Sequence, residues 1–193
     1  MKQGILACCG ALCIAAPAAA KWTEIEPAKV VVANKAMSVV ATPHWNRWSQ
    51  KPIKKEELWS FDGPLLNRIE FFGGIADGEP MAKEVNKKRE PLPKFSATMN
   101  TSEVVDLLER TTRIIDQSPD FQVDAVEPIL FAGQKGFRIA YHYTAGELAE
   151  RGEARGAIIN RKLYLIKYTA PALYYFEADA PAAIQIMESA AIS

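Results

Sequence analysis

Large apolar side chains alternate with polar or small residues in one stretch near the C-terminus. The alternation runs from residue 137 to residue 144. A period of two places every second side chain on the same side of an extended chain. We therefore predict a central strand whose core-facing side chains are Phe137, Ile139, Tyr141 and Tyr143, with His142 on the opposite, polar side.

Other strand-like runs lie on both sides of this stretch. They occupy residues 29–33, 36–42, 58–61, 65–72, 121–131, 154–159 and 162–169. Two-residue polar turns at Asn34-Lys35 and Asn160-Arg161 predict that the runs beside them form hairpins. Residues 43–55 and 75–98 have no clear period and are expected to be irregular, and residues 146–152 are expected to form a charged loop.

Helical spacing occurs in two places. Apolar residues recur every three or four positions between Val104 and Ile115, which predicts an amphipathic helix. Asn100 or Thr101 can cap this helix, and Glu103 fits a capping box with Asn100. A second helix is expected to begin at Asp179, with a proline in its first turn. Strands with so few helices predict an α+β fold with a central antiparallel β-sheet flanked by helices.

The C-terminal pattern resembles a known family. The residues that carry the resemblance are Phe131-x-Gly133-x-x-Gly136-Phe137-Arg138, Tyr141, Tyr143, Gly156-Ala157-Ile158-Ile159, Leu163-Tyr164-x-Ile166-x-Tyr168-x-Ala170-Pro171, Tyr174-Tyr175 and Ser189. From about Phe121 to Ser193 the chain is similar to the PsbP/DcrB-like (Mog-type) domains. The resemblance implies an α/β/α sandwich that serves as an interaction or accessory module, and it carries no catalytic residues.

The first 20 residues have the layout of a secretory signal peptide. They contain one lysine, an apolar stretch and an alanine-rich end. We therefore expect a signal peptide at residues 1–20, one domain at residues 21–193, and export to the periplasm. The run Ile5-Leu6-Ala7-Cys8 resembles a lipobox, so the alternative is a lipoprotein anchored to the membrane through Cys8.

Charge and cysteine content exclude several classes of function. Lys2 is the only charged residue in the first 20, so the rest of the chain has 22 basic and 23 acidic side chains. That balance argues against nucleic-acid binding, which needs a concentrated basic surface. The three cysteines all lie in the expected signal peptide, at Cys8, Cys9 and Cys13. The domain is therefore expected to lack disulfides and cysteine-ligated metal.

Candidate catalytic groups are few and have no motif around them. The two histidines, His44 and His142, lack the spacing of a zinc site, and no GxSxG or phosphate-binding glycine motif occurs. The carboxylate pairs Glu56-Glu57 and Asp77 with Glu79 are expected to be solvated in loops. We predict no catalytic residue, no metal and no cofactor.

Trp45, Arg47 and Trp48 form the one aromatic and basic cluster in an otherwise irregular segment. Tryptophan and arginine are over-represented among the residues that dominate binding at interfaces. We predict that these three residues contribute to a partner-binding surface. The alternative is that the tryptophans cover one end of the sheet.

These observations favour a non-enzymatic, exported cell-envelope protein that binds an unknown envelope partner and contacts the membrane only if Cys8 is lipidated. Two alternatives remain. One is an exported hydrolase with an unconventional site that uses His142. The other is a carrier of a small ligand or lipid, with an apolar pocket between the sheet and a helix.

Overall fold

The computed structural model describes residues 21–193, and the expected signal peptide with Cys8 lies outside the described residues. The strands are β1 (Trp22–Glu24), β2 (Lys29–Val32), β3 (Met37–Val40), β4 (Asn46–Trp48), β5 (Glu56–Ser60), β6 (Arg68–Ile75), β7 (Gln122–Phe131), β8 (Gln134–Ala145), β9 (Leu148–Ile159), β10 (Lys162–Pro171) and β11 (Ala191–Ile192). The helices are α1 (Thr101–Ile115) and α2 (Tyr175–Glu188). Neither of these helices has the length and apolar character needed to cross a membrane.

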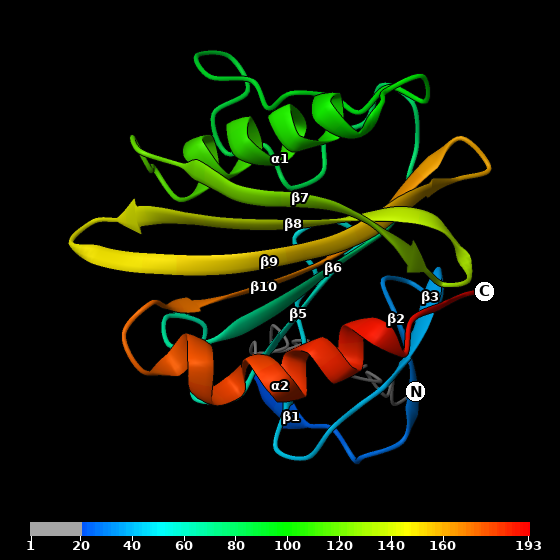
Figure 1. Cartoon of the computed structure of the whole chain (residues 1–193), viewed down its shortest axis with the longest axis vertical. Helices are drawn as coiled ribbons and strands as arrows, with labels where there is room; N and C mark the ends of the chain where they lie inside the picture. Colours follow the sequence, from blue (N-terminus) through cyan, green and yellow to red (C-terminus); the bar gives the residue numbers. More distant parts are fainter. Residues whose placement is uncertain (1–20) are drawn as a thin grey trace, which may run out of the picture.

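A large antiparallel sheet dominates the fold. Its eight strands lie in the order β1-β4-β5-β6-β10-β9-β8-β7. Helix α1 lies over one face, and α2 lies over the other beside the small sheet β11-β3-β2 (Figure 1). The predicted central antiparallel sheet is confirmed. The sandwich is matched only in part, because each helical layer consists of a single helix and the sheet makes up most of the domain.

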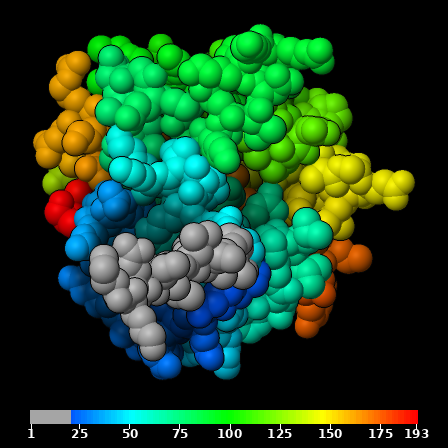
Figure 2. Space-filling model, turned by 180° about the vertical axis from the view of Figure 1, so that it is seen from behind, coloured from blue at the N-terminus to red at the C-terminus, as the bar shows by residue number. Residues whose placement is uncertain are grey.

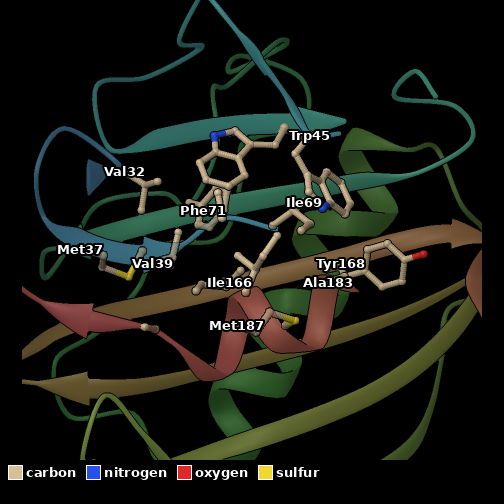
Figure 3. Close-up of a cluster of buried hydrophobic side chains, with 14 of the residues drawn as sticks. Val32, Met37, Val39, Trp45, Ile69, Phe71, Ile166, Tyr168, Ala183 and Met187 are labelled. Atoms are coloured by element: carbon tan, nitrogen blue, oxygen red, sulfur yellow. The ribbon is translucent and has the colours of Figure 1, made fainter. Parts of the chain in front are cut away.

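Strand β10 separates two hydrophobic cores. Its side chains alternate, so Tyr164, Ile166 and Tyr168 pack towards α2, whereas Leu163 and Leu165 pack towards α1. Figure 3 shows the core on the α2 side, where side chains from the two sheets and α2 meet. Burial on both faces explains why this strand appears in the sequence as a nearly continuous apolar run.

The register predicted for β8 is confirmed. Phe137, Ile139, Tyr141 and Tyr143 are all at most 4 % exposed and pack beneath α1. The Tyr141 ring stacks on Phe121 with 4.9 Å between the ring centroids. A one-residue slip would turn these four side chains away from the α1 core, so the burial of this face determines the pairing.

The predicted start of α1 is also confirmed. The Asn100 side chain accepts a hydrogen bond from the Glu103 amide, and the Glu103 carboxylate accepts one from the Asn100 amide. This capping box satisfies two backbone donors that would otherwise lack partners at the helix start.

Several predicted boundaries are wrong. Residues 43–55, expected to be irregular, contain strand β4, and the strand expected at residues 65–72 is β6 at Arg68–Ile75. Strand β9 begins at Leu148, inside the expected charged loop, because Ala145 and Leu148 pair directly across a two-residue turn. Helix α2 begins at Tyr175, so Asp179 does not cap it and Pro181 lies inside it. The Asp179 carboxylate instead accepts a hydrogen bond from Asn67 Nδ2 at 2.8 Å, a partner distant in sequence.

Candidate functional site

A pocket opens between the C-terminal half of α1 and the large sheet. Its volume is about 220 Å³, and Figure 2 shows a hollow on this side of the molecule, where the segments around residues 50 and 80 approach α1. The apolar part of its lining consists of Pro52, Phe72, Met81, Ala82, Val85, Leu108 and Ile115. An apolar cavity with a few convergent polar groups is the usual form of a small-molecule site.

Three neighbouring strands bring charged side chains to the inner end of this pocket. Glu56 comes from β5, Glu70 from β6 and Lys167 from β10. Glu70 and Lys167 are direct cross-strand partners, and their side chains form an ion pair of 2.7 Å. Strand alternation places all three on the sheet face that α1 covers. There they can pair with one another or face the pocket, although their neighbours on this face are apolar.

Behind the pocket the buried polar groups form a network. Arg68 forms ion pairs with Asp116 at 3.1 Å and Glu150 at 3.6 Å. The Tyr143 hydroxyl donates to Asp116 Oδ2 at 2.6 Å and accepts from Arg68 at 2.6 Å. Because Arg68, Asp116 and Glu150 each have a partner of opposite sign, these contacts limit the cost of burying the three ions.

Burial and neighbouring charges shift the pKa values in this network. Burial lowers the pKa of the Lys167 ammonium, but the nearby anions, above all the Glu70 carboxylate, raise it by more. The net pKa therefore lies above its usual value. The pKa of Arg68 is raised by the same balance of burial against Glu70 and other anions. For Asp116, burial raises the pKa, but the Lys167 and Arg68 charges lower it more. All three groups are therefore held in their charged forms.

Glu56 differs from Glu70, Asp116 and Glu150 in having no ion-pair partner among residues 21–193. Its side chain is only 7 % exposed, and Oε2 accepts no hydrogen bond from residues 21–193. Burial, followed by repulsion from Glu70, raises its pKa from 4.5 to about 7. Thr112 Oγ1, on α1, also lines the pocket and has no hydrogen-bond partner in the same part of the chain. Perturbed, unpartnered groups in a cavity are typical of functional sites.

We predict that Glu56→Gln makes the protein more stable than the wild type at pH 8. The carboxyl has its raised pKa of about 7 only in the folded state. Below pH 4.5 the carboxyl is protonated in both the folded and the unfolded wild type, so the two proteins should differ little in free energy of unfolding. Between pH 4.5 and 7 the unfolded chain loses its proton first, and the wild type loses stability on the order of 3 kcal/mol. Urea denaturation of both proteins at several pH values measures this difference.

Glu147→Gln is the matched control, because Glu147 is exposed in the turn between β8 and β9. It removes the same charge from a solvated position and should leave the pH profile unchanged. A Glu56→Gln profile parallel to that of the wild type would contradict a raised pKa at Glu56.

The carboxylate pair Glu56-Glu57 is not a solvated loop, which corrects the sequence-based expectation. Both residues lie in β5 and are buried on opposite faces of the sheet. Glu57 is 1 % exposed and pairs with Arg47 at 2.7 Å and Lys51 at 3.2 Å. It also accepts hydrogen bonds from the Trp59 indole and the Ala33 amide. These contacts connect the small sheet with the large one.

The predicted partner-binding residues lie at different depths. Trp45 is 1 % exposed, and its indole donates a hydrogen bond to Thr42, so this residue belongs to the core, as Figure 3 shows. Arg47 is a third exposed and pairs with Glu57. Trp48 is half-buried and packs against Trp22 with 4.8 Å between the ring centroids. Burial removes Trp45 from any binding surface in this fold, and the role of Arg47 and Trp48 remains a prediction.

His142 lies away from the pocket. Its Nδ1 is 2.8 Å from Asp124 Oδ1, and both side chains are 45 % exposed. Within the described chain no group of three or more histidine, cysteine, aspartate or glutamate residues is arranged to hold a metal ion. The pair resembles the base and orienting group of a hydrolase, but Asp124 is the only side chain hydrogen-bonded to His142 in residues 21–193.

A second candidate surface lies at one end of the large sheet. The connections that follow β5, β8 and β10 meet there, because Arg68 pairs with Thr169 and Glu150 pairs with Pro171. Figure 1 shows these connections side by side. Four large apolar side chains are exposed on them, and we call these residues the sheet-end surface: Leu65, Leu148, Leu173 and Tyr174.

The pocket residues have a weak signal in the sequence. Lys167 is the single charge in the apolar run that follows Lys162 in β10, and Arg68 and Glu70 alternate with Ile69 and Phe71 at the start of β6. Such positions can be recognised as polar residues on a buried face. Their convergence depends on the strand order, in which β10 lies next to β6, and this order is not visible in any local pattern.

Comparison with known proteins gives matches among solved structures alone. No model of a protein family matches the chain, and no curated protein matches it significantly. Cyanobacterial PsbP (CyanoP) from Synechocystis sp. PCC 6803 is 13 % identical, with a TM-score of 0.48 over 98 % of this chain and 100 % of that one. The Ran-binding protein Mog1p from Saccharomyces cerevisiae is 12 % identical, with a TM-score of 0.48 over 90 % of this chain and 96 % of that one.

A further match is LpqN of Mycobacterium tuberculosis, described as involved in cell envelope biogenesis. It is 10 % identical, with a TM-score of 0.39 over 90 % of this chain and 91 % of that one. These neighbours are the PsbP and Mog1 type of protein to which the sequence pattern is similar. Similarity at this level concerns the fold and says nothing of what this chain binds.

Proposed function

We propose that this chain is an exported accessory protein of the cell envelope, which acts by binding a partner protein and catalyses no reaction. The observation that carries the proposal is the sheet-end surface. Its side chains are well exposed: Leu173 is 87 %, Leu65 77 % and Tyr174 73 % exposed. Large apolar side chains exposed together at one end of a sheet are typical of binding sites.

The backbone at Tyr174 supports the same proposal. Its φ is +70° and its ψ is −60°, and the Tyr175 amide donates a hydrogen bond to the Leu173 carbonyl at 3.0 Å, so Tyr174 lies at the centre of a rare and strained type of γ-turn. Strain of this kind persists where the surrounding structure maintains it, and it is enriched at functional positions. Tyrosine is also among the residues that contribute most to binding at interfaces. The strained turn therefore presents a suitable anchor to a partner.

The location rests on the first 20 residues, which have the layout of a signal peptide. Under this proposal the exported form begins at or near Lys21, and its mass shows this directly. An acylated N-terminal Cys8 would instead make the protein a membrane-anchored lipoprotein. The partner-binding proposal is compatible with either form.

Site-specific photo-crosslinking in the native envelope tests the partner-binding proposal. A photoreactive amino acid replaces Leu65 in one variant and Leu130 in another. The two positions are 77 % and 76 % exposed, but Leu130 lies near the end of β7, at the opposite end of the sheet. We expect a discrete crosslinked protein from position 65 and none from position 130, because only the first lies on the sheet-end surface.

Two results would contradict the proposal. Equal crosslinking from both positions, or none from either, would mean that the sheet-end surface has no specific partner. Turnover of an ester, peptide or glycoside substrate by the purified protein, abolished by His142→Ala, would favour the hydrolase alternative. The pair of His142 with Asp124 makes that variant the relevant one.

A further inference from the structure

The pocket beneath α1 is separate from the sheet-end surface and has a chemistry of its own. We propose that it binds a small molecule with a short apolar body and an ammonium head, and that the Glu56 carboxylate holds this head. This inference goes beyond the proposed partner binding, since it concerns a different part of the molecule and a different class of ligand.

The walls and size of the pocket define the body of the ligand. The side chains around it are mainly apolar, and they come from α1, the sheet and the segment around Met81. Its volume is about 220 Å³. That is below the range of ~300–1,000 Å³ for pockets that hold drug-sized molecules. A short alkyl chain fits this space.

Two oxygen atoms define the head of the ligand. Glu56 Oε2 and Thr112 Oγ1 line the pocket, and both lack a hydrogen-bond partner among residues 21–193. Glu56 is 7 % exposed and Thr112 is 2 % exposed, so bulk solvent does not supply partners freely. A buried polar group without a partner is costly. A ligand with several N–H donors would satisfy both oxygens.

The charge around the pocket favours a cation over an anion. Four carboxylates lie in or behind the pocket, at Glu56, Glu70, Asp116 and Glu150, against two buried basic groups, Arg68 and Lys167, and the exposed Lys83. Arg68 and Lys167 already have carboxylate partners, and the carboxylates outnumber the basic groups even with Lys83 included. A bound ammonium group would therefore compensate excess negative charge, whereas a bound carboxylate would add to it.

Binding should depend on pH because the ligand needs the ionised form of Glu56. The pKa of this carboxyl in the free protein is about 7. The charged groups that also line the pocket are Glu70, Lys167 and Lys83, and α1 contributes only uncharged side chains there. An alkylammonium ion keeps its charge below pH 10. Its affinity should therefore fall roughly thirtyfold from pH 8 to pH 5.5, because Glu56 must then lose a proton.

Titration calorimetry of the domain from Lys21 with three six-carbon probes tests the proposal. At pH 8 we expect hexylammonium to bind with one-to-one stoichiometry, hexanol to bind at least tenfold more weakly, and hexanoate not to bind. Affinity within a series of alkylammonium ions should rise about fourfold per methylene until the pocket is full. Failure of the partner-binding proposal would leave these results unchanged, since no partner protein is present.

Substitution identifies the binding group. Glu56→Gln should weaken hexylammonium binding at least tenfold and remove its pH dependence, while Glu147→Gln should change neither. Circular dichroism verifies that both variants are folded. The proposal is overturned if hexanoate or hexanol binds as tightly as hexylammonium, if Glu56→Gln leaves the affinity unchanged, or if hexylammonium does not bind at millimolar concentration.

Discussion

Gly152→Ala should lower the free energy of unfolding by about 3 kcal/mol, at the upper end of the usual cost of overpacking a core. Gly152 is the cross-strand partner of Tyr141, and the Tyr141 ring covers it. A Cβ atom at Gly152 would lie 2.1 Å from Tyr141 Cζ. The ring cannot move aside freely, because it stacks on Phe121 and its hydroxyl lies 3.0 Å from Thr169 Oγ1. Urea denaturation of the two proteins measures the change.

The same substitution in a Tyr141→Ala background distinguishes this clash from a general effect of the residue type. Without the ring, alanine at position 152 should cost little, since alanine has no intrinsic disadvantage over glycine in a strand. The two substitutions should therefore be strongly non-additive. An equal cost of Gly152→Ala in both backgrounds would contradict the clash.

Ile139→Ala should lower the free energy of unfolding by about 2–5 kcal/mol, because it removes buried methyl groups and leaves a cavity. Ile139 is 0 % exposed in the core beneath α1. His142→Ala on the same strand should cost less than about 1 kcal/mol, since its side chain is 45 % exposed and its contact with Asp124 lies at the surface. Thermal and urea unfolding of both variants give the comparison. Similar losses would mean that β8 has another register in solution.

Local patterns in the sequence were sufficient for the parts of the fold that neighbouring residues determine. The start of α1 depends on Asn100 and Glu103, which are three residues apart and bond each other. The core-facing side of β8 follows from strict alternation between Phe137 and Tyr143. Both predictions are confirmed because the sequence pattern that indicates each of them lies within one element.

Boundaries that depend on pairing were harder to predict. Strand β9 extends into the charged stretch before Gly152, because β8 and β10 lie on either side and supply hydrogen-bond partners. In the same way, Asp179 resembles a helix cap, but Asn67 binds it from another part of the chain. Tertiary partners outweighed local preference in both cases.

The sequence by itself therefore determined the class of fold, an antiparallel sheet with two helices, and the side of β8 that is buried. Only the tertiary structure decided which polar residues are buried together. Glu56, Glu70, Lys167 and Thr112 come from four different elements, and their contact depends on the order β5-β6-β10 and on the place of α1 above it. Burial makes a charged side chain depend on partners that are distant in sequence, so its role cannot be read from its neighbours in the chain.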